Sequence, residues 1–185
     1  FLTLDELLSL SDIVTLHVPF TTEGPDKTAG MASGEFFARM RPGSAFINCS
    51  RGPVMQDGPL LDALRKGHIA YAAIDTWNHE PGIDRELLAR AFCATPHIAG
   101  YSVQGKAAGT AAVVRSVSEL YGLPLTEWYP PQVTPTVPDR SVTWDGLQRS
   151  LPRYFDIEAE TTYLKQHPER FEELRNNYPY RTEYF

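Results

Sequence analysis

The sequence of 185 residues predicts an α/β fold built on a parallel sheet. Short runs rich in β-branched and small apolar residues alternate along the chain with helical patterns of about ten residues. Ionisable residues follow directly after three of these runs, as they do at the carboxyl ends of parallel strands in α/β enzymes. A hydrophobic share of 42% and a charged share of 22% are those of a folded globular protein.

The elements follow one another in that order from the first residues. Thr3 is placed to cap a helix that begins with Leu4. Leucines at helical spacing predict two further helices, around residues 60–64 and 87–91. The expected strands are the runs 12–19, 44–48, 69–75 and 91–95.

The second half of the chain changes character. Apolar and small residues repeat every three or four positions from Val103 to Tyr121, which predicts one long amphipathic helix ending at Gly122. Residues 123–139 hold five of the 15 prolines, which is typical of an extended connector. Short helices are expected at 157–166 and 169–176, split by Pro168.

The tail from residue 151 carries eight of the 21 aromatic residues, more than so short a segment could bury alone. Its rings therefore pack back on the same chain or face a second subunit, where Tyr and Phe are favoured. We prefer the second subunit.

Charge and composition exclude several function classes. A net charge of −6 offers no basic surface for nucleic acid, and the longest apolar runs are too short to span a membrane. Cys49 and Cys93 lie 44 positions apart in apolar surroundings, which favours buried thiols in a reducing compartment and hence the cytoplasm. The histidines and cysteines show no metal-ligand spacing, so we expect no metal, and neither Cys49 nor Ser50 sits in a nucleophile elbow.

Three residues are the candidates for chemistry. Arg51, Glu80 and His97 each follow a different expected strand, so we expect them at one edge of the sheet. Histidine can accept and return a hydroxyl proton near neutral pH, and a neighbouring carboxylate fixes its tautomer. A guanidinium presents a planar fork to a carboxylate, so Arg51 could hold a 2-hydroxy or 2-oxo acid while a hydride moves to a nicotinamide.

Three runs of the chain resemble the D-2-hydroxyacid dehydrogenases that act with NAD. They are the segments 41–54, 73–81 and 95–102, which include the residues just named. The resemblance implies the C-terminal half of a Rossmann-type, parallel-sheet NAD-binding domain in residues 1–101 and a long helix in 102–123 that returns to a substrate domain. It also implies a proline-rich connector in 124–138 and a small α+β dimerisation domain in 139–185, which would make the protein a homodimer.

The same resemblance implies roles for individual residues. His97 would be the acid/base, Glu80 its partner, and Arg51 the clamp of a small phosphorylated 2-hydroxy acid that also lines the NAD site. The remaining implied contacts are Val18, Cys49, Ser50, Asp75 and Gly100 with the cofactor, and Tyr101 with the substrate.

The departures from the family pattern set further expectations. The glycine-rich G-x-G-x-x-G turn that binds the cofactor's pyrophosphate is missing from this sequence, as is the N-terminal substrate domain. We therefore expect this to be the C-terminal half of a longer protein, inactive and without useful NAD affinity alone. Val18 replaces an expected Thr, and the segment 55–57 departs from the usual Val-Asp run. Two alternatives stay open: a dehydrogenase of glycerate, phosphoglycerate or lactate, and an NAD-sensing corepressor without enzymatic activity.

Overall fold

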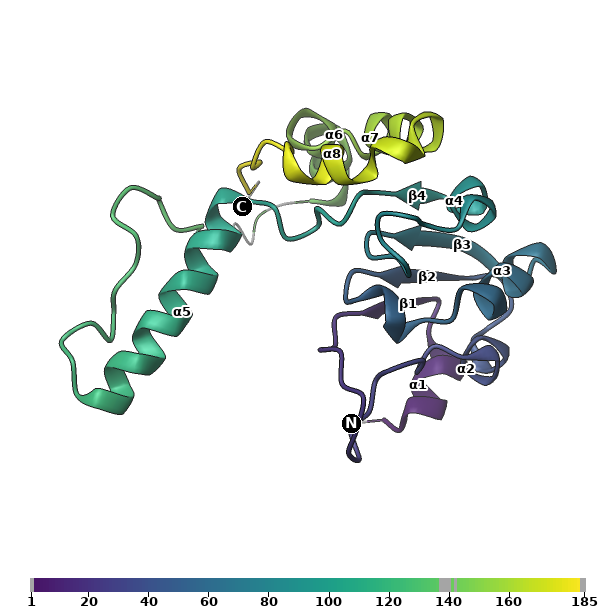
Figure 1. The fold of residues 1–185 in the computed structure, drawn as a ribbon, viewed down its shortest axis with the longest axis horizontal. Helices are drawn as coiled ribbons and strands as arrows, with labels where there is room; N and C mark the ends of the chain where they lie inside the picture. The colour runs from purple at the N-terminus through teal and green to yellow at the C-terminus, as the bar shows by residue number, and fades with distance from the viewer. Residues whose placement is uncertain (1, 137–140, 142, 184–185) are drawn as a thin grey trace. The chain divides into compact units, whose positions relative to one another are not determined.

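The computed structural model describes residues 2–136, 141 and 143–183. The chain divides into two compact units, which Figure 1 draws in one picture. The first unit comprises residues 1–98 and 157–177, and the second comprises residues 99–156 and 178–185.

The first unit is built on a parallel sheet of four strands in chain order (Figure 1). In the register of the sheet, Asn48 pairs with Ile74, and Ile74 pairs with Ala94, so the carboxyl ends of three strands lie at one edge. The strands are β1 (Ile13–Leu16), β2 (Ser44–Asn48), β3 (Ile69–Ile74) and β4 (Cys93–Ala94). The expected α/β class and all four expected strands are confirmed, with β1 and β4 shorter than their apolar runs.

Helices of the first unit precede the first strand, connect the strands or follow α6 of the second unit in the chain. They are α1 (Leu4–Leu10), α2 (Gly34–Arg39), α3 (Asp57–Arg65), α4 (Arg85–Arg90), α7 (Ile157–Gln166) and α8 (Phe171–Asn176), with 3-10 turns η1 (Gly52–Val54) and η2 (Pro168–Arg170). Thr3 caps α1 as expected, and its partner Glu6 completes a capping box. The sequence did not predict α2, whose six residues are too few to show a helical period.

The core of the first unit is aromatic at one side of the sheet and includes part of the tail. Phe37 and Phe46 meet edge to face, with 5.0 Å between ring centroids. Leu164 of α7 and Phe171 of α8 are at most 1% exposed and belong to the same core. Residues 157–177 therefore belong to the same compact unit as the sheet, and the expected dimerisation domain in 139–185 stays a prediction.

The second unit holds α5 (Val103–Tyr121) and α6 (Trp144–Tyr154). The long helix has its expected bounds and ends at Gly122, which adopts a left-handed conformation with φ 64°. The sequence did not predict α6, which contains Pro152 and a glycine. Pro138 and the boundary between residues 138 and 139 lie outside the described residues. The expected α+β domain in 139–185 requires strands. Among the described residues of that segment, β pairing is limited to Arg181, which forms an isolated bridge with Ser102.

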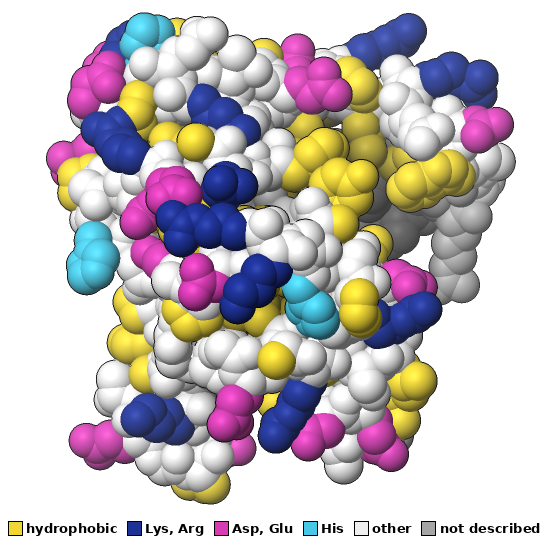
Figure 2. Space-filling view, turned by 90° about the vertical axis from the view of Figure 1, so that its right-hand side faces the viewer, with side chains coloured by type: hydrophobic (Ala, Val, Ile, Leu, Met, Phe, Trp, Pro, Cys, Tyr) yellow, Lys and Arg dark blue, Asp and Glu magenta, His cyan; other side chains and the backbone are white. Residues whose placement is uncertain are grey.

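On the face drawn in Figure 2, side chains of Lys and Arg are interspersed with those of Asp and Glu. None of the described helices is both long and apolar enough to cross a membrane.

Candidate active site

The site lies at the carboxyl edge of the sheet in the first unit. Arg51 follows β2 by three residues, Glu80 follows β3 by six, and His97 follows β4 by three. Because the three strands are parallel neighbours in register, the loops that carry these residues leave the same edge, as the sequence predicts.

Glu80 and His97 form a hydrogen-bonded pair. Nδ1 of His97 lies 2.9 Å from Oε2 of Glu80, and the two side chains are 20% and 17% exposed. The other carboxylate oxygen, Oε1, accepts a hydrogen bond from the backbone N–H of Trp77 at 2.8 Å. An ionised Glu80 accepts a hydrogen bond from Nδ1–H of His97, which leaves Nε2 of His97 as the proton acceptor.

Several effects oppose one another at the Glu80 carboxyl. Its burial disfavours the charged form, whereas the hydrogen bonds from His97 and Trp77 and the charges of His97 and Arg175 favour it. The favourable contacts prevail and hold the pKa of Glu80 below its usual value. Glu80 is therefore an ionised hydrogen-bond acceptor, and His97 keeps its Nε2 nitrogen available to accept a proton.

Asp75 fixes the loop that carries His97. The backbone N–H of His97 donates to the carbonyl of Asp75 at 2.8 Å, with His97 in the left-handed region at φ 58°. The Asp75 carboxylate accepts hydrogen bonds from Ile98 N–H at 2.7 Å and from the Thr95 hydroxyl at 2.6 Å. Asp75 is only 4% exposed, so its contacts in this unit hold the backbone, and its expected place facing the nicotinamide stays a prediction.

Asn48 holds the loop that carries Arg51. Its amide nitrogen donates to the carbonyls of Arg51 and Thr76, at 3.3 and 3.2 Å, and its oxygen accepts from the N–H and hydroxyl of Ser50. Both hydrogens and the oxygen of this fully buried amide are used. One side chain thus links the loops after β2 and β3.

Arg51 itself is exposed, and its Nη1 donates to the carbonyl of Ser50 at 2.6 Å. The structure places it at the same edge as the Glu80–His97 pair, with its described hydrogen bond directed to its own loop. Its expected contact with a substrate stays a prediction.

Gly52 lets the loops after β2 and β3 touch. A Cβ atom at this position would lie 1.8 Å from the carbonyl oxygen of Trp77 and 2.5 Å from the amide nitrogen of Asn78. The position therefore requires glycine for lack of space, and the contact sets how closely the Arg51 loop approaches the Glu80 loop.

Uncharged residues flank this edge at β1 and β2. The N–H of Cys49 donates to the carbonyl of Leu16, which brings Cys49 next to the segment that leads to Val18. Burial, together with the nearby charge of Asp75, raises the pKa of Cys49 to about 11, so it is a neutral thiol at physiological pH. The uncharged thiol of Cys49 can therefore pack against the ring of a nicotinamide cofactor.

Gly100 and Tyr101 belong to the second unit, so their expected contacts with cofactor and substrate stay predictions. Within that unit the ammonium of Lys106 lies 4.5 Å from the centroid of the Tyr101 ring. The ring of Tyr180 meets Tyr101 nearly at right angles, with 5.6 Å between centroids.

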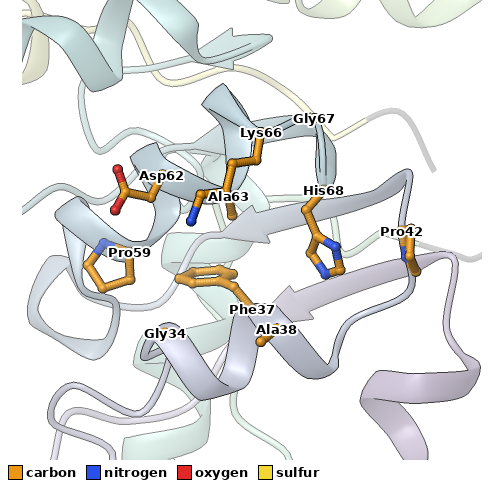
Figure 3. A pocket seen from close by; sticks show the side chains of 10 residues that line it. All are labelled: Gly34, Phe37, Ala38, Pro42, Pro59, Asp62, Ala63, Lys66, Gly67 and His68. Atoms are coloured by element: carbon orange, nitrogen blue, oxygen red, sulfur yellow. The ribbon is translucent and has the colours of Figure 1, made fainter.

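A cavity of about 650 Å³ lies away from these residues (Figure 3). Phe37 of α2 and Ala63 of α3 line it, together with Pro42 and His68, which precede β2 and β3. It therefore opens towards the amino ends of these strands and is not part of the site. Among the described residues, no group of three or more His, Cys, Asp and Glu side chains is placed to hold a metal ion.

Sequence reasoning missed three contributors to the site: Asn48, Gly52 and Arg175. The first two lie near Arg51 in the run 41–54, so their position at the end of β2 and in the loop after it was the available signal. Arg175, whose Nη1 lies 3.5 Å from Oε2 of Glu80, is 95 positions further along the chain, and no sequence pattern links the two.

Comparisons with known proteins agree with this geometry. Residues 1–99 match the family model of the D-isomer specific 2-hydroxyacid dehydrogenase, NAD binding domain. Erythronate-4-phosphate dehydrogenase from Bacteroides thetaiotaomicron is 40% identical over 99% of this chain and 52% of its own length. The enzyme of the same name from Cronobacter sakazakii is 36% identical, over 100% of this chain and 51% of its own. The chain thus spans about half the length of the curated relatives it matches.

Solved structures agree as well. D-mandelate dehydrogenase from Rhodotorula graminis superposes with a TM-score of 0.56 and 29% identity, over 73% of this chain and 39% of the other. A D-isomer specific 2-hydroxyacid dehydrogenase from Xanthobacter autotrophicus was solved with NADPH and MES. It superposes with a TM-score of 0.52 and 33% identity, over 65% of this chain and 49% of the other. The family match, which covers more than half of the sequence, shows that this chain belongs to the D-isomer specific 2-hydroxyacid dehydrogenases and carries part of their NAD-binding domain.

Proposed function

We propose that the full-length protein oxidises 4-phospho-D-erythronate at C2 to the 2-oxo acid with NAD, in the biosynthesis of pyridoxal 5'-phosphate. The hydrogen-bonded Glu80–His97 pair is the observation that carries the reaction class. The names of the relatives at 36–40% identity support the substrate.

The residues of this chain would act on the proton and the charge of the substrate. Nε2 of His97 accepts the C2 hydroxyl proton, while Nδ1–H stays hydrogen-bonded to Glu80 and the resulting positive charge is stabilised by that carboxylate. Bound NAD would supply the hydride acceptor, so that C2, having lost its hydroxyl proton to His97 and a hydride to the cofactor, would become a carbonyl carbon. Cys49 and Val18 would flank the nicotinamide, and Ser50 and Gly100 would contact the cofactor through their backbones.

Arg51 would bind the substrate's carboxylate. Its guanidinium is exposed at the edge of the sheet and can exchange the hydrogen bond to Ser50 for a bidentate contact with the acid. Tyr101 would contact the rest of the substrate. This arrangement recognises only the 2-hydroxy acid end, so recognition of the phosphate requires groups outside the triad.

We further propose that the protein is a cytoplasmic homodimer. Tyr154, Tyr163 and Tyr180 are 48%, 36% and 54% exposed, and such amphipathic rings suit a subunit interface. Sedimentation of the full-length protein tests this, and a monomer at micromolar concentration would contradict it.

The test of function is NADH formation by the full-length protein, followed by absorbance with 4-phosphoerythronate and, separately, with glycerate. We expect turnover of the phosphorylated acid to be the faster, and equal rates would contradict the substrate assignment. His97→Asn should lower kcat by about 100-fold or more, because general acid–base catalysis contributes 10²–10⁴-fold. The matched control is His79→Asn, since His79 is exposed and has the same φ of 58°, and no described hydrogen bond joins its side chain to Glu80 or His97. Unchanged turnover by His97→Asn would contradict the reaction class.

A further inference from the structure

Arg175 is the third group on the Glu80 carboxylate. Its Nη1 lies 3.5 Å from Oε2, the same oxygen that faces Nδ1 of His97, while Trp77 N–H occupies Oε1. The Arg175 side chain is 35% exposed and that of Glu80 is 17% exposed, so the ion pair is partly shielded from water. The carboxylate is thus held from three directions.

The helix that carries Arg175 is fixed to the first unit by its own packing. Phe171, at the start of α8, is 1% exposed within the core. In α7, the Thr161 hydroxyl accepts a hydrogen bond from Ala94 N–H at 3.0 Å, and Lys165 donates to the Ala91 carbonyl at 2.6 Å. Tertiary packing therefore brings Arg175 to Glu80 across a long stretch of sequence.

A small cavity lies beside the ion pair. Its volume is about 110 Å³, and Glu80, Pro81, Phe171 and Arg175 line it together with Glu172 and Asn176. Glu172, an exposed residue of α8, is the other charged residue of this lining. The space leaves the Glu80 side chain room to turn if Arg175 does not hold it.

On this geometry we propose that Arg175 is a positioning residue, which holds the Glu80 carboxylate on the imidazole of His97. The inference rests on the proposed function for its catalytic consequence. Loss of Arg175 frees Glu80 to turn towards the cavity and removes a positive charge that favours its ionised form. His97 then loses part of the partner that orients it, although the binding of the 2-hydroxy acid by Arg51 is untouched.

The kinetic test compares three variants of the full-length protein. Arg175→Met should lower kcat about tenfold with KM for the 2-hydroxy acid within twofold, and should change the acid limb of the kcat profile relative to the wild type. Arg175→Lys should restore most of the rate, because it keeps the charge. The matched control is Arg170→Met, which breaks an exposed ion pair with Glu173 in the same tail and should leave both rate and profile unchanged.

A second measurement does not depend on turnover. In protein labelled with [13C]glutamate, the carboxyl resonance of Glu80, assigned by its loss in Glu80→Gln, should titrate at higher pH in Arg175→Met than in the wild type. If Arg175→Met does not fold, Arg175→Lys takes its place. The Glu80 resonance should then titrate at a pH above that of the wild type, but by a smaller margin than Arg175→Met would give. Identical titrations and identical pH profiles in all folded variants would overturn the inference. A shifted titration in a protein that oxidises no 2-hydroxy acid would support the positioning of Glu80 and contradict the proposed function.

Discussion

Replacing Gly52 by alanine tests whether the contact between two loops positions the site. Gly52 is not among the glycines with positive φ, so alanine can adopt its backbone conformation. The obstacle is the backbone of the next loop, since the new Cβ would lie 1.8 Å from the Trp77 carbonyl oxygen and 2.1 Å from its carbon. The substitution therefore perturbs packing alone.

The size of the effect follows from these distances. Cβ contacts shorter than 3.0 Å essentially do not occur, so the loops must separate by more than 1 Å. Overpacking of this kind costs roughly 1–3 kcal/mol of folding free energy. A displacement of about 1 Å between Arg51 and the Glu80–His97 pair should also slow catalysis about 100-fold.

Two assays on the full-length protein measure these effects: the midpoint of urea unfolding, and the rate of NADH formation. Gly58→Ala is the matched control, because a Cβ there meets nothing within 4 Å and the position lies in the first turn of α3. Alanine should stabilise that helix by up to about 1 kcal/mol. If Gly52→Ala unfolds at the wild-type midpoint and retains the rate within twofold, the loop contact does not position the site.

Three further predictions concern single side chains at the same edge. Asn48→Ala should lower the free energy of unfolding by about 2–4 kcal/mol, measured in urea, because it leaves buried partners unpaired; a loss under 0.5 kcal/mol would refute this. The lowered pKa of Glu80 stabilises the folded state above its ordinary value of 4.5, and this contribution is lost as pH falls through the folded pKa. The melting temperatures of wild type and Glu80→Gln should therefore converge below pH 4.5, and a constant difference would contradict the shift. With a pKa of about 11, Cys49 should react with iodoacetamide at pH 8 about 100-fold more slowly than a free thiol, followed by mass spectrometry, and equal rates would exclude that value.

The sequence predicts the part of the site that depends on strand ends. Each β run is followed closely by its polar residue, so parallel pairing is enough to bring Glu80 and His97 to one edge. The bounds of α5 and α7 agree with the sequence because their apolar spacing lasts for ten residues or more. By contrast, α2 has only six residues, and α6 is interrupted by Pro152.

The remaining features depend on tertiary distances that a single sequence does not encode locally. The approach of Gly52 to Trp77 is a contact between two backbones, and glycine is equally common in loops that touch nothing. Arg175 reaches Glu80 only because Phe171 and Leu164 bury themselves in the core. The same burial explains why the tail packs partly on its own chain, although its aromatic content favours an interface.

The hydrogen bond from Ala94 N–H to Thr161 bears on how the chain can be shortened or fused to other proteins. Helix α7 supplies an acceptor to a strand of two residues that has no further neighbour in the described sheet. A protein cut after residue 156 would lose that acceptor together with two core side chains, and its last strand would be open to pairing with another molecule. Expression vectors that end at the limit of the family match, near residue 99, should therefore yield more aggregate than vectors that retain residues 157–177.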